Sequence, residues 1–277
     1  MNQPTDWGID PKYYLPDALW ERAMPLLPAP KPKKKAGRPR MDDRQALTAI
    51  FYLARTSCQW NALPRSLGAD STVHDRFEEW VADGFFQRLW VAGLLEYDAR
   101  CGLEWEWQAM DGVMTKAPLG QAQTGPNPTD RGKGGTKRSV LTEGHGLPIG
   151  VAVDGANRHD SKLVQATLES IPIERPQPSA EQEQHLCLDA AYVGQAVEET
   201  LAQWGYTAHI RGRGEEKEAR QQIPGYRARR WVVERTHSWM NRFRRLLIRW
   251  EKKPAHYVGF VHFACAFICF RAAGLFG

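Results

Sequence analysis

The sequence predicts an α/β protein in which a small all-helical region precedes a domain built on a mixed β-sheet. Two patterns predict this class. Apolar residues recur at helical spacing up to about residue 103. From residue 104 onward, short strand patterns alternate with helical ones. The chain has 277 residues, 42% of them hydrophobic and 25% charged, which is enough for two globular parts and unlike a disordered chain.

We predict an N-terminal segment with a basic arm over 1–40, a helical region over 41–103 and the sheet domain over 104–277. The arm KPKKKAGRPR carries six basic residues and two prolines in ten positions, which favours an extended conformation. Its Arg38 and Arg40 could lie in a DNA minor groove, because GRPR partly resembles the core of an AT-hook. A solvated linker is the alternative interpretation.

The helical region is predicted to contain four helices. The first, in MDDRQALTAIFYLARTSCQW, begins at an Asp cap and places apolar residues at helical spacing. A short helix, WNALPRSLG, a glycine turn and a second helix, ADSTVHDRFEEWVADG, then resemble a helix-turn-helix unit. The second helix is expected to begin at Asp70 or Ser71 and to expose Thr72, His74, Asp75 and Arg76. A purely structural or dimerising helical bundle remains the alternative.

The sheet domain is predicted from the order of its elements. A strand in EWEWQAMDGVMTK precedes a hairpin, KRSVLTEGHGLPIGVAVDG, with EGHG as its tip. The helix DSKLVQATLESI, the strand HLCLDAAYVG, the helix AVEETLAQWG and the strand YTAHIRGRG follow, and the basic segment RARRWVVERTHSWMNRFRRL ends the series as a helix. The order β-β-β-α-β-α-β-α is that of a ribonuclease H-like (retroviral integrase-type) fold with helices flanking the sheet.

Charge and cysteine usage indicate the partner and the compartment. The net charge is +5 and the pI near 9.0, which favours an acidic partner such as nucleic acid. The five cysteines form no CxxC pair, which suits a reducing cytoplasm, and the N-terminus lacks the layout of a signal peptide. The apolar stretch 257–270 is predicted to be a buried helix without a membrane role. A metal cluster of His262, Cys265 and Cys269 is the less favoured interpretation, because their spacing matches no common zinc pattern.

Two aspartates are predicted to meet at the sheet. We expect Asp111 to close the first strand and Asp189 to close a strand parallel to it, which makes the two neighbours. Small residues flank both, in MDG and LDAA, so a ligand can approach closely. Asp154 and Asp160 are competing candidates, but the first precedes a turn and the second resembles a helix cap.

The basic segment is predicted to be an amphipathic helix with one acid, Glu234, on its polar face. At 100° per residue, one side carries the residues expected to be buried: Val232, Thr236, Trp239, Phe243, Leu246 and Trp250. The opposite side carries Arg230, Glu234, His237, Asn241, Arg244 and Arg245. Glu234 is either solvated there, with Arg230 as its i,i+4 partner, or it joins the two aspartates.

The blocks AMDGVMTKAP, LTEGHGLPIGVAVDGANRHDS, LDAAYVG and RRWVVERTHSWMNRFRRL resemble those of bacterial insertion-sequence transposases of the DDE class, in the IS-five-like branch. The resemblance runs from about residue 104 to the C-terminus, and the helical region is similar as well. It implies that Asp111, Asp189 and Glu234 are the catalytic, metal-binding triad. Of the related signature Tyr-x2-Arg-x3-Glu-x6-Lys, Arg230 and Glu234 are present. Arg227 stands at the Tyr position beside Tyr226, and Asn241 stands at the Lys position, where Arg244 or Arg245 could substitute.

The resemblance implies hydrolysis at the ends of a transposon and strand transfer into target DNA. Three carboxylates favour Mg²⁺, with two ions expected and Mn²⁺ able to substitute. The expected partners are double-stranded DNA, as terminal inverted repeats and target, and a second copy of the chain, with no membrane. Candidate DNA-contacting residues are Arg38, Arg40, Lys133, Lys137, Arg138, Arg230, His237, Asn241, Arg244 and Arg245. A catalytically inactive DNA-binding regulator and a metal-dependent nuclease without strand transfer are the alternatives.

Overall fold

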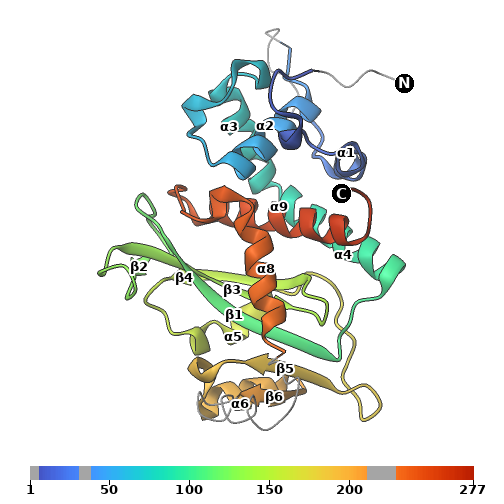
Figure 1. The fold of residues 1–277 in the computed structure, drawn as a ribbon, viewed down its shortest axis with the longest axis vertical. Helices are drawn as coiled ribbons and strands as arrows, with labels where there is room; N and C mark the ends of the chain where they lie inside the picture. The colour runs from blue at the N-terminus through green and yellow to red at the C-terminus, as the bar shows by residue number, and fades with distance from the viewer. Residues whose placement is uncertain (1–5, 31–38, 211–228) are drawn as a thin grey trace.

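The computed structural model describes residues 6–30, 39–210 and 229–277. Figure 1 shows a group of helices above a β-sheet, with the last helix of the chain lying between them. Most of the predicted basic arm, including Arg38, lies outside the described residues. So does the start of the predicted basic helix, with Tyr226 and Arg227.

The helical part contains α1 (Asp17–Ala23), α2 (Asp43–Thr56), α3 (Asp70–Ala82) and α4 (Phe85–Cys101). Short 3₁₀ turns accompany them at Pro11–Tyr13, Met24–Leu26, Trp60–Ala62 and Arg65–Leu67. The predicted Asp cap of α2 is confirmed, because an Asp42 carboxylate oxygen accepts the N–H of Gln45 at 2.9 Å. The helix ends at Ser57, whose left-handed backbone turns the chain away.

The region predicted to be a helix-turn-helix unit differs from the expectation. The stretch 60–68 forms two separate 3₁₀ turns, because Pro64 interrupts it. The predicted cap of α3 is wrong, since neither Asp70 nor Ser71 caps it and its first residue follows Ala69 without a side-chain cap.

Two of the four side chains expected to be exposed on α3 are not. Thr72 and Asp75 are exposed, but Arg76 is buried in an ion pair with Asp43 and His74 is half-buried against Trp60.

The strands of the sheet are β1 (Trp107–Lys116), β2 (Gly125–Pro126), β3 (Gly134–Thr142), β4 (Pro148–Gly155), β5 (Gln184–Leu188) and β6 (Tyr206–Ile210). Apart from the short β2, the strands follow one another along the chain in the predicted order. The order across the sheet is β2-β3-β1-β5-β6, and β4 also pairs with β3. β3 runs antiparallel to β1 and β4, whereas β5 runs parallel to both β1 and β6. Leaving aside the short β2, this mixed sheet is the ribonuclease H-like arrangement that the element order predicted.

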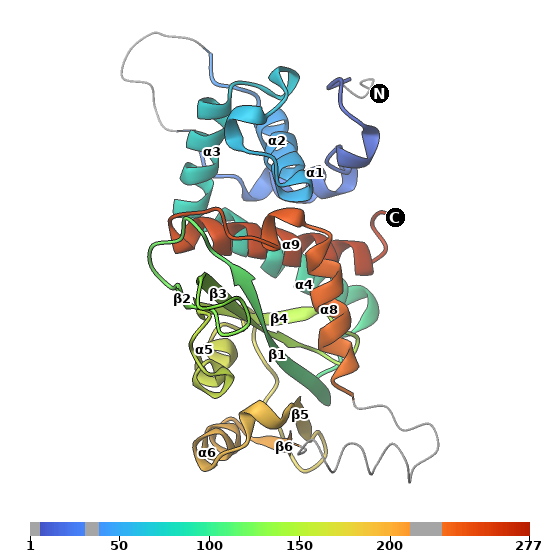
Figure 2. The same ribbon diagram turned by 60° about the vertical axis from the view of Figure 1, so that its left-hand side comes forward.

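Helices cover both faces of this sheet. On one face lie α5 (Val164–Glu169) and α6 (Gln195–Gln203), and on the other α8 (Trp231–Asn241) crosses β1 and β3 (Figure 2). Further 3₁₀ turns lie at Asp160–Lys162, Ala190–Tyr192 and Arg244–Leu246. The last helix, α9 (Pro254–Ala272), packs along α4 and also contacts β4.

The prediction that the apolar stretch 257–270 is a buried helix is confirmed. By length and composition α9 could cross a membrane, but most of it is buried inside the protein. Phe260 stacks on Phe77 of α3 with ring centroids 4.5 Å apart, and Phe267 stacks on Phe51 of α2 at 5.5 Å. The helical part and the sheet therefore share one core through α9.

Candidate active site

Two of the predicted acids occupy matching positions on neighbouring strands. The parallel pairing of β1 with β5 ends at Ala109 and Cys187, and Asp111 and Asp189 each follow two residues later. Asp189 comes directly after β5, as predicted. Asp111 does not close β1, which continues to Lys116 by pairing with β3; what ends near it is the pairing with β5. The register therefore places the two carboxylates beside one another near the carboxyl end of β5.

A local hydrogen bond orients Asp189. One of its carboxylate oxygens accepts the N–H of Ala191 at 2.8 Å, and the chain turns there into the 3₁₀ segment Ala190–Tyr192. This bond holds one carboxylate oxygen on the turn and so fixes the orientation of the side chain.

A third aspartate, Asp160, joins this pair. Its Oδ2 accepts a hydrogen bond from Nζ of Lys137 at 2.9 Å, and the same ammonium donates to the carbonyl of Arg158 at 2.7 Å. Its Oδ1 packs over Gly112, where any Cβ would collide with it, which explains the small residue after Asp111. The interpretation of Asp160 as a helix cap is wrong, because α5 begins at Val164 and no side chain caps it.

Burial and the neighbouring acids disfavour the ionised form of Asp111. Burial raises the pKa of Asp111 to about 6, and the charges of Asp189 and Asp160 add to this effect. The N–H of Gly112 and the guanidinium of Arg230 act in the opposite direction. Buried Oδ1 of Asp160 has no hydrogen-bond partner among the described residues. Oxygen donors that repel one another and include an unpartnered oxygen fit a hard divalent cation such as Mg²⁺.

The helix α8 brings His237 against the same aspartate. Nε2 of His237 lies 3.7 Å from Oδ2 of Asp111. Burial lowers the pKa of His237 to about 3, and the nearby charge of Arg138 adds to the effect, so the ring is neutral at pH 7. The expectation that His237 lies on an exposed polar face is wrong, because α8 presses this side of the helix onto β1 and β3.

The third predicted acid, Glu234, lies one turn before His237 on α8 and is exposed. Three helical residues advance about 4.5 Å, so Glu234 is on the part of α8 that reaches Asp111. Among the described residues, the possible metal-ligand atoms of Asp111, Asp189 and Glu234 do not all lie within 4.8 Å of one another. A group that meets this distance lies elsewhere in the protein. A cation bound by the triad would therefore require side-chain movement, for which an exposed glutamate has freedom.

The candidate DNA-contacting residues divide by exposure. Lys133, Asn241 and Arg244 are exposed, and Arg230 is half-buried near Asp111. Arg40 forms an ion pair with Glu79 at 3.0 Å.

Lys137 and Arg138 are buried on β3, so neither presents a free cation at the surface. The Lys137 ammonium holds Asp160, as described above. The Arg138 guanidinium lies under α9 and donates to the hydroxyl of Tyr257 at 3.3 Å.

Arg245 is also buried, contrary to the helical-wheel prediction. The helix ends at Asn241, and Phe243 takes a non-helical backbone conformation, so the wheel fails beyond this point. The Arg245 Nε donates to Glu251 at 2.6 Å and its Nη1 to the carbonyl of Cys58 at 2.8 Å. For the same reason Trp250, expected to be buried, is exposed.

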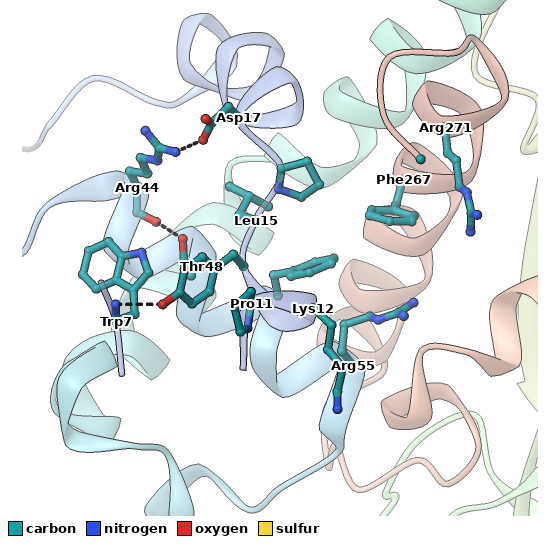
Figure 3. Close-up of a pocket in the computed structure, with 14 residues that line it drawn as sticks. Trp7, Pro11, Lys12, Leu15, Asp17, Arg44, Thr48, Arg55, Phe267 and Arg271 are labelled. Atoms are coloured by element: carbon teal, nitrogen blue, oxygen red, sulfur yellow. Dashed lines mark hydrogen bonds and ion pairs between the residues drawn. The ribbon is translucent and has the colours of Figure 1, made fainter. Parts of the chain in front are cut away.

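The structure shows a group of cations that the sequence did not connect, here called the basic cluster: Lys12, Arg55, Arg242 and Arg271. Lys12, Arg55 and Arg271 line a hollow of about 440 Å³ between the N-terminal segment, α2 and α9 (Figure 3). Arg55, Arg242 and Arg271 line an adjoining hollow of about 350 Å³. Burial lowers the pKa of Arg55, and the charges of Arg242 and Arg271 lower it further. Repelling cations beside open hollows suit a polyanion.

The cysteine-containing part of α9 belongs to the core. Cys265 and Cys269 are buried, and burial raises the pKa of both thiols. His262 stacks on Trp90 with centroids 5.2 Å apart. These residues pack α9 against α4, which agrees with the favoured prediction.

The strand order and the paired aspartates place the sheet domain in the ribonuclease H-like fold class. Two family models match: "Putative transposase of IS4/5 family" over residues 15–90 and "Transposase DDE domain" over residues 108–268. The chain belongs to the DDE transposases of the IS4/5 type.

Several individual proteins are similar to this chain. The "Putative transposase for insertion sequence element IS402" of Burkholderia cepacia is 32% identical over 161 residues, which cover 55% of this chain and 71% of that protein. The "Insertion element IS402 uncharacterized 16.2 kDa protein" of the same species is 32% identical over 121 residues, 42% of this chain and 82% of that one. Among solved structures, "Crystal structure of a pre-cleavage Mos1 transpososome" is 12% identical, with a TM-score of 0.29, and covers 88% of this chain and 82% of that one.

Proposed function

We propose that this transposase binds the terminal inverted repeats of its insertion sequence, cleaves the DNA at the element's ends and transfers the cut strand into target DNA. The observation that carries the proposal is the placement of Asp111 on β1 and of Asp189 directly after the parallel strand β5, with the charge of Asp160 nearby. Carboxylates grouped in this way have little use in a DNA-binding protein without catalytic activity, because their repulsion destabilises the fold.

Asp111, Asp189 and Glu234 would hold divalent cations, for which Mg²⁺ is the expected ion and Mn²⁺ a substitute. Bound there, such ions stabilise negative charge at phosphorus and lower the pKa of an attacking water or 3′-hydroxyl. Glu234 is the acid with freedom to move, since its side chain is exposed. Asp160, which accepts a hydrogen bond from Lys137, adds a further negative charge near Asp111.

The basic cluster provides a path for the DNA backbone beyond the acids. Arg242 follows Glu234 by eight residues, which corresponds to about 12 Å along a helix. A strand with its reacting phosphate at the acids can thus extend along α8 toward Arg242, Arg55 and Arg271. Exposed Lys133, Asn241 and Arg244 are further contacts. Since two transposon ends react together, we propose that the active form is a homodimer or higher oligomer on DNA.

The experiment supplies the protein with Mg²⁺ and DNA that carries either intact or precut element ends. Joined products support transposition, cleavage alone supports a nuclease, and binding alone supports a regulator. Asp189→Asn should abolish cleavage and joining while end binding is kept. The matched control is Asp154→Asn, because Asp154 pairs with Arg158 at 3.1 Å at the surface of β4 and should tolerate the change. Full cleavage by Asp189→Asn contradicts the proposed site.

A further inference from the structure

A second group of metal-ligand side chains lies apart from the aspartates, between α3 and α9. His74 and Glu78 are one helical turn apart on α3, and His256 is in the first turn of α9. One donor atom from each residue lies within 4.8 Å of the other two. Residues at i and i+4 share one face of a helix, so the sequence HDRFE directs an imidazole and a carboxylate toward α9.

The separation of the donor atoms fits a transition-metal ion. Nε2 of His256 lies 3.4 Å from Oε1 of Glu78. Zinc binds imidazole nitrogen and carboxylate oxygen at about 2.0–2.2 Å, so two such ligands of a tetrahedral ion are about 3.4 Å apart. Two imidazoles and one carboxylate are a ligand set suited to zinc, whereas Mg²⁺ prefers oxygen donors only.

Neighbouring side chains hold the two imidazoles in place. The Trp60 ring packs edge-on against His74 with centroids 4.7 Å apart. Phe77 packs edge-on against His256 at 5.5 Å, and the two imidazoles are 5.9 Å from each other. Burial lowers the pKa of His256, which favours the neutral ring that a metal requires.

In this structure the ammonium group of Lys253 supplies the positive charge beside Glu78. Nζ of Lys253 lies 2.7 Å from Oε1 of Glu78, and its side chain is 65% exposed. Such a side chain can swing into water, so a metal ion would replace one cation with another. The three ligands also line a hollow of about 670 Å³, where water can complete the coordination.

We propose that His74, Glu78 and His256 bind one zinc-class transition-metal ion that fastens α3 to α9. The ion has one coordination position open toward the hollow. Because α9 packs on the sheet domain and α3 belongs to the helical part, the bound ion stabilises the junction of the two. The site shares no residue with Asp111, Asp189 and Glu234.

The test uses the untagged full-length protein, stripped with EDTA and titrated with Co²⁺ or Zn²⁺ in excess Mg²⁺, which occupies carboxylate sites. We expect one Co²⁺ per chain, with the visible absorption of a low-coordinate ion, and a rise in Tm with Zn²⁺. Glu78→Gln and His256→Ala should each weaken binding at least tenfold. Lys253→Met should tighten it, because the competing ammonium is gone.

Two controls separate this site from others. His145→Ala removes a histidine with an exposed side chain elsewhere and should leave Co²⁺ binding unchanged. Asp111→Asn should also leave it unchanged, so that failure of the proposed catalytic site and failure of this proposal give different results. The proposal is overturned if no Co²⁺ binds, or if Glu78→Gln, which keeps the size of the side chain, binds it as tightly as the parent protein.

Discussion

Replacing Asp111 by Asn should make the metal-free protein more stable, although it removes a residue proposed to be catalytic. The folded-state pKa of about 6 against an ordinary 3.8 means that ionised Asp111 is disfavoured in the folded protein. The difference corresponds to about 3 kcal/mol at neutral pH. The side chain is still 30% exposed, so screening by water reduces the expected gain to about 1–2 kcal/mol.

The pH dependence of unfolding shows whether ionised Asp111 stabilises or destabilises the folded protein. Between about pH 4 and pH 6 folded Asp111 keeps a proton that the unfolded chain releases, so the parent protein loses stability as pH rises. Above about pH 6 the loss is complete, and below about pH 4 it is absent. The advantage of Asp111→Asn should therefore be full at pH 7.5 and vanish near pH 4, while groups common to both proteins cancel.

The measurement is urea unfolding of both proteins in EDTA at pH 7.5 and at pH 4, followed by circular dichroism. Adding Mg²⁺ at pH 7.5 should stabilise the parent protein and leave Asp111→Asn nearly unchanged, because a ligand of the ion is lost. A variant that is less stable than the parent at pH 7.5, or an advantage that does not change with pH, would refute the reasoning.

Two other predictions concern the cations. Lys137→Met should lower the free energy of unfolding in urea by about 3 kcal/mol, because it leaves the Asp160 carboxylate unpaired next to other acids. Adding Asp160→Asn should recover most of this loss. Equal losses in the single and double variants would contradict the pairing. Arg242→Ala with Arg271→Ala should weaken DNA binding and reduce the slope of log K against log salt by about 2, measured by fluorescence anisotropy. The control Arg100→Ala, which breaks a surface pair, should keep the slope, and an unchanged slope in the double variant would remove the basic cluster from the interface.

Periodicity alone was sufficient for much of the fold. The alternation around Ala109, the apolar run ending at Leu188 and the hairpin tip at 143–146 predicted strands that the structure contains in the predicted order. These signals are local, because they depend on which faces of a strand or helix must be buried. The apolar composition of α9 likewise predicted burial, and α9 is the element that joins the two parts of the protein.

The surroundings of Asp160 could not be predicted in this way. A serine or aspartate before a helical pattern is usually a cap, and nothing near Asp160 in the sequence indicates Lys137 as its partner. The pairing depends on β3 lying beside β4, because the chain that follows β4 then brings Asp160 to Lys137 on β3. The residue type made Asp160 a candidate site residue, and only the tertiary structure showed that it contacts Lys137.

The sequence by itself determined the order of strands and helices along the chain and the basic charge, because these follow from local pattern and composition. Only the tertiary structure decided which charged residues are free. Arg138, His237 and Arg245 look like surface residues in the sequence, yet the structure buries all three. The packing of α8 and α9 on the sheet covers Arg138 and His237, whereas Arg245 lies against Cys58 and Glu251. Burial depends on what lies across from a side chain, and no spacing along one segment contains that information.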